Sequence, residues 1–270
     1  MDKLVYISEG FNKQEALGCT LLIGVGQPTD MFAVIDSHSG LKFLATGHPD
    51  GEPAEVKDLL TYEFGEVKIM AQDLGYSFIP DEVYDAASLP VYQRFLPVEE
   101  TAAPTVSRIA SQDIRLISRL NRLGLERYTA KFPEAAVYPR IYAYLRGIEQ
   151  LVAESAHVLA IDKTTGSIVN ICYFHGGKMH YCNDFEIHSP TDLHYYLLTL
   201  VGHLGVEGQQ LMLVLSGDFT AGDSYSACLA GFGKTTIWAN IAAPVGLSLP
   251  ADLPLEQHSC FSLFALQLCG

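Results

Sequence analysis

The sequence lacks any long uninterrupted run of apolar residues. No stretch approaches the roughly 18–20 uncharged residues that a helix needs to cross a bilayer, although 49% of the 270 residues are hydrophobic. The amino terminus, MDKLVYISEGF, carries acids where a secretory signal would have a basic start and an apolar core. The apolar C-terminal segment SCFSLFALQLCG spans only about a dozen residues, which favours a buried final strand over an anchor. We therefore expect a cytoplasmic protein without direct membrane insertion.

Basic residues are scarce: 17 Lys and Arg stand against 31 Asp and Glu, for a formal net charge of −14. Nucleic-acid affinity rests largely on basic side chains that neutralise phosphates, so such a chain is repelled by a phosphate backbone. The one basic cluster recurs among apolar residues between Arg108 and Lys131, as on the solvated face of an amphipathic helix. We expect no nucleic-acid partner.

The six cysteines include no Cys-x-x-Cys pair, so a structural zinc site has no support. Cys172 and Cys182 flank a turn at residues 175–178 and could lie opposite one another. We interpret them as small buried hydrophobic residues because a reducing cytoplasm disfavours disulfides. No His-x-x-x-His pair is present, and no metal site is predicted.

Recognisable catalytic motifs are also missing. The segment 230–236, AGFGKTT, has Cys228 where a phosphate-binding Walker loop requires its first glycine. The triplet at residues 216–218, Ser-Gly-Asp, lacks the Gly-x-Ser-x-Gly elbow of hydrolases. We assign no catalytic residue.

The sequence contains one order of predicted strands and helix that occurs twice. Three extended apolar runs, an amphipathic helix and a further run occupy residues 20–26, 31–36, 41–46, 53–64 and 67–71. The same order returns at residues 157–162, 168–174, 179–187, 190–204 and 211–215. The repetition predicts two similar lobes, residues 1–138 and 139–270.

The second-half helix has the clearest boundaries. Ser189 is a good N-cap, Pro190 suits the first helical position, and Gly205 supplies a left-handed stop. Each helix leads to a solidly apolar run, VKIMA or LMLVL, which is typical of a strand covered on both faces. A crossover of this kind places the returning strand parallel within its sheet. We expect an α/β (α+β) protein in which each lobe is a mixed five-stranded sheet with helices.

A region without a counterpart in the repeat separates the two lobes. A helix is predicted to start within residues 78–83, and a strand is predicted over residues 105–110. Ser111 reads as the N-cap of a helix over 113–131, and a further helix is predicted over 140–153.

Strand-strand-strand-helix-strand, duplicated, resembles the plan of the actin-like ATPases, in which each lobe is a ribonuclease-H-like unit. The sequence itself resembles a bacterial family, mostly from Bacteroidetes, known as a domain of unknown function. Residues 181–219, with paired tyrosines Tyr195 and Tyr196 and a strand ending in Ser-Gly-Asp, carry the likeness together with residues 78–83. The family is similar in fold to the actin-like pilus-assembly protein of type IV pilus systems and to the cytoplasmic part of a type II secretion scaffold.

The resemblance implies three nucleotide-binding turns, which this sequence retains incompletely. The first-lobe turn, residues 24–29, has glycines but no preceding acid, and Pro28 removes an N–H donor. The second-lobe turn, residues 162–166, keeps an acid, two hydroxyls and a glycine. The adenine turn, at residues 217–218, keeps one glycine of two. The cofactor-binding candidates are therefore Asp162, Thr164, Thr165, Gly166 and Gly217, interpreted as vestiges of nucleotide turns.

We expect no cofactor, with ATP and Mg²⁺ as the alternative. The preferred hypothesis is a non-catalytic, actin-like scaffold that binds an unidentified protein partner in a cytoplasmic-side assembly. An actin-like ATP-binding switch, with nucleotide held between the lobes, is the second hypothesis. A phosphotransferase acting on a small metabolite is the third.

Overall fold

A computed structural model describes residues 4–26, 29–48, 51–98, 104–122, 124–152, 157–164, 166–207, 210–251, 253 and 255–270. The chain forms two compact units: residues 1–146, 242–255 and 262–270 make up the first, and residues 147–241 and 256–261 the second. The predicted lobes, 1–138 and 139–270, were defined by the duplicated strand order. The compact units are defined by packing, and the segments after residue 241 alternate between them.

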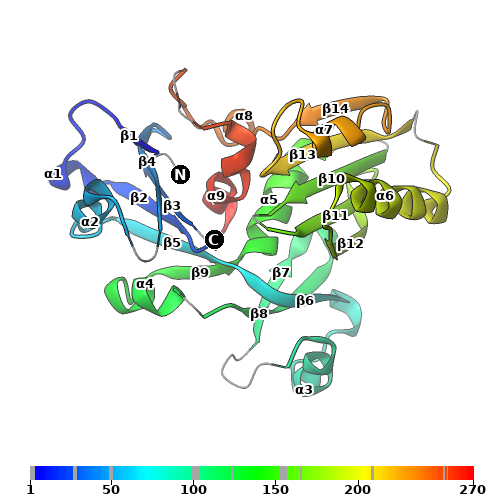
Figure 1. The fold of residues 1–270 in the computed structure, drawn as a ribbon. Coiled ribbons are helices and arrows are strands. Elements are labelled where there is room, and N and C mark those ends of the chain that lie inside the picture. Colours follow the sequence, from blue (N-terminus) through cyan, green and yellow to red (C-terminus); the bar gives the residue numbers. More distant parts are fainter. Residues whose placement is uncertain are drawn as a thin grey trace. The chain divides into compact units, whose positions relative to one another are not determined.

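A six-stranded mixed sheet forms the body of the first unit, in the order β1-β4-β3-β2-β5-β9 (Figure 1). Its strands are β1 (Val5–Ile7), β2 (Cys19–Gly24), β3 (Asp30–Asp36), β4 (Leu41–Gly47), β5 (Glu66–Ala71) and β9 (Ala136–Pro139). β2, β3 and β4 are antiparallel neighbours, and β5 returns parallel to β2, as predicted. The short strands β1 and β9 were not predicted.

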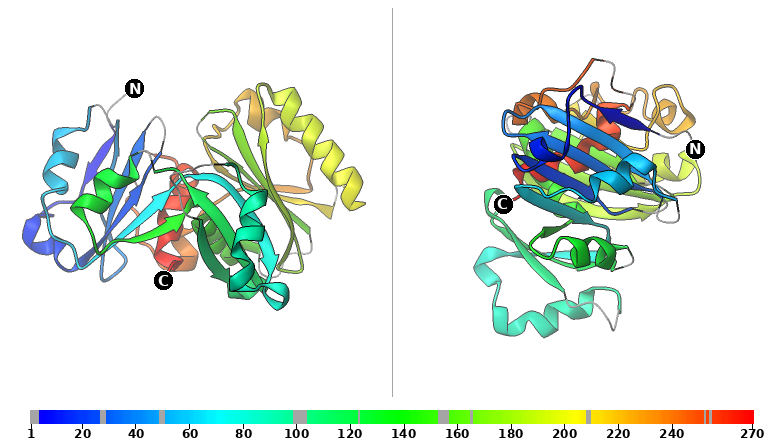
Figure 2. Two further views of the ribbon diagram at one scale, coloured as in Figure 1. Left: turned by 90° about the horizontal axis from the view of Figure 1, so that it is seen from below. Right: turned by 90° about the vertical axis from the view of Figure 1, so that its left-hand side faces the viewer.

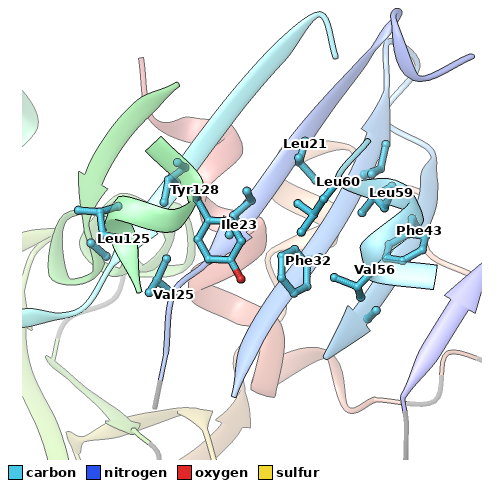
Figure 3. Close-up of a cluster of buried hydrophobic side chains, with 14 of the residues drawn as sticks. Leu21, Ile23, Val25, Phe32, Phe43, Val56, Leu59, Leu60, Leu125 and Tyr128 are labelled. Carbon is cyan, nitrogen blue, oxygen red and sulfur yellow. The ribbon is translucent and has the colours of Figure 1, made fainter. Parts of the chain in front are cut away.

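Helices α2 (Ala54–Leu59) and α4 (Leu125–Lys131) cover the same face of this sheet. Figure 3 shows Val56, Leu59, Leu125 and Tyr128 meeting one hydrophobic core with the inward side chains of β2 and β3. α2 ends earlier than the predicted residue 64, although Tyr62 and Phe64 still pack against that core. A short helix α1 (Lys13–Ala16) precedes β2.

A separate three-stranded antiparallel sheet, β6-β8-β7, also belongs to the first unit. Its strands are β6 (Asp73–Pro80), β7 (Thr105–Ile109) and β8 (Ile114–Leu120). Between β6 and β7 lie η1 (Asp81–Val83), η2 (Ala86–Ser88), α3 (Leu89–Tyr92) and η3 (Gln93–Phe95). The helix start predicted at 78–83 is therefore a strand end followed by a single 3-10 turn.

The helix predicted over 113–131 is wrong in its first half. Asp113 adopts a left-handed conformation (φ 56°) that follows η4 (Ala110–Gln112) and turns the chain into β8, so Ser111 caps no helix. β8 lies between β6 and β7 and pairs with both, and this pairing outweighs the helix propensity of its Leu and Arg residues. Of the described residues in this range, those of α4 (Leu125–Lys131) are the helical ones.

A five-stranded mixed sheet forms the second unit, in the order β12-β11-β10-β13-β14. Its strands are β10 (His157–Lys163), β11 (Ile168–His175), β12 (Lys178–Glu186), β13 (Met212–Gly217) and β14 (Thr235–Trp238). β10, β11 and β12 form the predicted meander, and β13 is parallel to β10 as predicted. β14 begins at Thr235, so the fragment 230–236 leads into a strand, whereas a Walker loop leads into a helix.

Helix α6 (Pro190–Leu204) runs along one face of this sheet, as the left view of Figure 2 shows. Its inward residues Leu193, Leu197 and Leu200 share a core with β10, β11 and β13. The predicted ends are confirmed: the Ser189 hydroxyl accepts from the Asp192 N–H, and Gly205 is left-handed (φ 64°). Helix α5 (Arg140–Val152) precedes β10, as predicted, and α7 (Ser224–Cys228) follows β13.

The predicted final strand is wrong, because the C-terminal segment is helical. It consists of η6 (Gln257–Cys260), α9 (Phe261–Ala265) and η7 (Leu266–Leu268), after a short α8 (Ala242–Val245). Residues 263–266 are consecutively buried, which suits a helix surrounded by protein. A short apolar run without alternation does not by itself distinguish a buried helix from a buried strand.

Candidate functional site

The candidate site lies at the carboxyl ends of β10 and β13. In open α/β sheets, ligands bind beside the carboxyl ends of parallel strands, where the chain departs in opposite directions. β10 pairs with β13 on one side and with β11 on the other. The parallel register places Asp162 beside Ser216 and Lys163 beside Gly217. Two of the predicted residues, Asp162 and Gly217, therefore meet here.

Asp162 is held inside the sheet by its neighbours. The Ser216 hydroxyl donates to Asp162 Oδ1 over 2.6 Å, and the two residues are 1% and 0% exposed. On the other side of Asp162 lies Asn170, whose Nδ2 donates to Asp184 Oδ1 over 2.8 Å. Asp184, Asn170, Asp162 and Ser216 thus form one row across four strands, which we call the polar row.

Gly217 is required at the end of β13. It adopts φ +81°, and a Cβ on it would lie 2.1 Å from the Lys163 carbonyl oxygen and 2.9 Å from Asp162 Oδ1. The close approach lets the N–H of Asp218 donate to the Lys163 carbonyl over 2.7 Å. A residue with a side chain would push the two strand ends apart.

Lys163 is a site residue that the sequence reasoning missed. Its Nζ donates to the Asp218 carbonyl over 3.0 Å and to the Asp218 carboxylate over 3.2 Å, and lies 5.2 Å from the centre of the Tyr225 ring. Lys163 is 9% exposed. Its position directly after the predicted Asp162 was the available signal.

The loop after Phe219 is braced by Asp223. The Asp223 carboxylate accepts from the N–H groups of Ser226 over 2.6 Å and Thr220 over 3.1 Å, so it caps α7. Burial alone would raise the pKa of Asp223, but these hydrogen bonds, together with nearby Lys163, hold the pKa below its ordinary value.

The predicted turn after Asp162 is only partly engaged with this site. Thr164 turns back onto its own hairpin, since its N–H and its hydroxyl both donate to the Ile168 carbonyl over 3.0 Å. Gly166 adopts φ +98° and has open space where a Cβ would stand. Thr165 lies outside the described residues.

In the first unit, the corresponding strand ends are those of β2 and β5. The Val25 N–H donates to the Met70 carbonyl over 2.8 Å, and the Gly26 N–H donates to the Asp30 carboxylate over 2.9 Å. Pro28 lies outside the described residues. A protein carboxylate therefore accepts the N–H that a phosphate-binding turn would offer to its ligand.

Asp30, itself buried, is the centre of a partly exposed ionic cluster that sequence reasoning also missed. Tyr128 donates to Asp30 Oδ2 over 2.7 Å, and Arg127 forms ion pairs with Asp30 at 2.5 Å and with Glu52 at 3.5 Å. Burial raises the pKa of Tyr128 well above its ordinary value, and the adjacent Asp30 adds to the rise. The acid of this turn follows the glycines instead of preceding them.

A groove of about 530 Å³ in the first unit is lined by residues 60–67 and 131–136. It lies at the amino end of β5, the opposite end of that strand from Met70 and the turn at Gly26. The groove therefore does not belong to the turns described above.

Two further properties concern the described residues as a whole. No group of three His, Cys, Asp or Glu side chains among them could hold a metal ion. Likewise, no helix within the described part of the chain is long and apolar enough to cross a membrane.

Two solved structures are among those that resemble this chain. One is a Bacteroides thetaiotaomicron protein with actin-like ATPase fold and unknown function: the TM-score is 0.72 and the identity 16%, over 89% of this chain and 99% of that one. The other is from the PilM-PilN type IV pilus biogenesis complex, with a TM-score of 0.64 and 11% identity over 96% of this chain and 100% of that one. These likenesses show that the chain has the actin-like ATPase fold, as predicted. No curated protein matches the chain significantly.

The model of a family described as protein of unknown function (DUF3822) matches residues 52–232. The chain belongs to this family, which confirms the predicted resemblance.

Proposed function

We propose that this DUF3822 member is a non-catalytic, actin-like scaffold that binds another protein in an assembly on the cytoplasmic side of a membrane. The observation that carries the proposal is the 2.9 Å hydrogen bond from the Gly26 N–H to the Asp30 carboxylate. Asp30 supplies the anion of this turn from within the chain, and a phosphate brought to the same donor would meet that negative charge.

The other backbone donors of these turns, in both units, support the same proposal. A turn that wraps a phosphate leaves its N–H groups for the ligand. Here the Val25, Thr164 and Asp218 N–H groups donate to carbonyl oxygens of the same chain. The Asp162 carboxylate, 1% exposed and bonded to Ser216, is likewise engaged inside the sheet. A protein that keeps this fold, while the N–H groups of its turns bond to its own oxygen atoms, is suited to binding another protein.

A relative supports the expectation of a protein partner. The structure with a TM-score of 0.64 comes from a complex of PilM with PilN. The protein in it that resembles this chain therefore assembles with another protein. For the present chain, the partner is a proposal and its identity is unassigned.

Isothermal titration of the full chain with Mg-ATP tests the proposal. We expect no heat beyond dilution, and binding with low-micromolar affinity would overturn it. A second measurement uses a partner isolated by co-purification and titrated directly. Its affinity should be the same with and without Mg-ATP, because a scaffold of this kind does not depend on nucleotide.

Gly166 favours a second candidate function, an ATP-binding protein that uses the second-lobe turn. Its φ of +98° and the open space around it are features of a turn that a ligand can approach closely. This candidate predicts that Mg-ATP raises the melting temperature and that Asp162→Ala abolishes the shift. Asp162→Asn, which can still accept from Ser216, tests the charge alone, and Glu186→Ala, at an exposed position of β12, is the control. An unchanged shift in both Asp162 variants would eliminate the role of Asp162.

A further inference from the structure

Two cysteines are paired across the hairpin of β11 and β12, the two strands labelled in Figure 1. Cys172 and Cys182 are direct register partners in an antiparallel pair, and their sulfur atoms lie 2.7 Å apart. Directly opposed antiparallel residues have Cα atoms roughly 4.5–5.5 Å apart, within the roughly 4.4–6.8 Å that a disulfide spans. The backbone is thus already in place for a bond between them.

The other four cysteines have different surroundings. Cys19, Cys228 and Cys269 each direct their thiol to a backbone carbonyl in the preceding turn. Cys260 is buried, with the Ser259 hydroxyl 4.0 Å from its sulfur. No disulfide links the six cysteines, all of which are among the described residues. The hairpin pair is therefore distinguished by a second sulfur within reach.

We propose that Cys172 and Cys182 form a dithiol site that low-molecular-weight disulfides oxidise to a cross-strand disulfide. Cys182 is partly exposed and Cys172 is fully buried, so the oxidant reaches Cys182 first. The Cys182 sulfur attacks the small disulfide, forms a mixed disulfide and releases one small thiol. Cys172 then loses its proton, attacks the Cys182 sulfur and displaces the second small thiol. Two electrons pass to the oxidant, and two protons leave the cysteines for the two released thiols.

The second step requires the buried Cys172 thiol to lose its proton. Burial first, and then the hydrogen bond with Cys182, raise the pKa of the Cys172 thiol well above its ordinary value. Since the thiolate is the attacking species, closure of the disulfide should accelerate as the pH rises.

The pair is connected to the polar row. The Cys172 thiol lies 3.1 Å from Asn170 Oδ1, and Asn170 Nδ2 lies 3.6 Å from the Cys182 sulfur. Oxidation consumes the S–H that donates to Asn170, the residue beside Asp162 in the sheet. The site stands on these contacts alone and does not depend on the scaffold proposal.

The test equilibrates the full chain with oxidised and reduced glutathione at graded ratios, blocks remaining thiols with maleimide and digests with trypsin. Cleavage after Lys163 and Lys178 separates Cys172, in fragment 164–178, from Cys182, which shares fragment 179–234 with Cys228. We expect these two fragments to become disulfide-linked, with a loss of two hydrogens, while the other four thiols stay available to maleimide.

Three variants assign the link. It should persist in Cys228→Ser and disappear in Cys182→Ser, and Cys172→Ala should accumulate a stable glutathione adduct on Cys182. Fragments that stay separate at every ratio in the wild-type chain would overturn the proposal. So would a link that survives Cys182→Ser, since it would then run to Cys228.

Discussion

The hydroxyl of Ser216 donates a 2.6 Å hydrogen bond to the carboxylate of Asp162 from the neighbouring parallel strand. Both residues are almost completely buried, so the Ser216 hydroxyl is a donor that the buried carboxylate receives away from water. Removing a hydrogen-bond partner from a charged group costs much more free energy when that group is buried than when it is exposed to water.

Ser216→Ala should therefore destabilise the protein by about 1–3 kcal/mol, because it withdraws a donor from a buried carboxylate. Urea denaturation monitored by circular dichroism measures the change. The matched control is Ser224→Ala on exposed α7, expected within about 0.5 kcal/mol of wild type. Equal effects in the two variants would show that the Asp162 bond contributes nothing.

Gly217→Ala and Gly222→Ala separate steric overlap from backbone strain. Both glycines have φ +81°, but a Cβ on Gly217 would meet the Lys163 carbonyl at 2.1 Å, whereas nothing lies within 4 Å of one on Gly222. Gly222→Ala should cost about 1–2 kcal/mol, the penalty for a left-handed alanine. Gly217→Ala should cost more than about 3 kcal/mol, since the strand ends must also separate. The two midpoints of chemical denaturation give the comparison, and similar costs would contradict the close approach.

Tyr128→Phe tests the ionic cluster around the buried Asp30. It keeps the ring packed edge-on against Phe32 but removes the hydrogen bond to the carboxylate. We expect a loss of about 1.5–3 kcal/mol, typical of a hydrogen bond to a charged group.

Tyr62→Phe is the matched control for this variant. Tyr62 donates to the Asp58 carboxylate over the same 2.7 Å, but Asp58 is exposed, so the expected change is about 0.5 kcal/mol or less. If Tyr62→Phe proves as costly as Tyr128→Phe, burial is not what strengthens the Asp30 bond.

Asp192 gives the start of α6 a pH dependence. Its carboxylate accepts from the His188 N–H and also from the Ser189 N–H, and these bonds hold its pKa below the ordinary value of 3.8. A depressed folded pKa means that the stabilisation is present above the unfolded pKa and is lost as the pH falls through the folded pKa. Denaturation midpoints should therefore decline below about pH 4, and more steeply in wild type than in Asp192→Asn. Parallel profiles for the two proteins would contradict this role of Asp192.

The strand order of each lobe could be predicted because its causes are local. Turn residues such as Gly176 and Gly177, both with positive φ, set the hairpin between β11 and β12. The parallel return of β5 and β13 follows from the handedness of the crossover, which the sequence pattern already implies. Helix α6 was predictable to its ends because Ser189, Asp192 and Gly205 satisfy its terminal groups from within the same segment.

Residues 113–120 could not be assigned from their own pattern. Leu116 and Leu120 fit one face of a helix equally well, and only pairing of β8 with strands on both sides selects the extended form. The buried C-terminal helices were missed for a related reason, since burial on all sides leaves no periodicity to read.

The sequence by itself determined the duplicated strand order, the parallel return strands and the presence of Asp162 and Gly217 at two strand ends. Only the tertiary structure decided what those strand ends can do. Asp30 reaches back to the Gly26 amide, Lys163 reaches Asp218, and Ser216 bonds to Asp162 across 54 positions of sequence. The bonds of Lys163 and Ser216 depend on strand register and side-chain direction, which arise from packing of the whole sheet and leave no local trace in residue spacing.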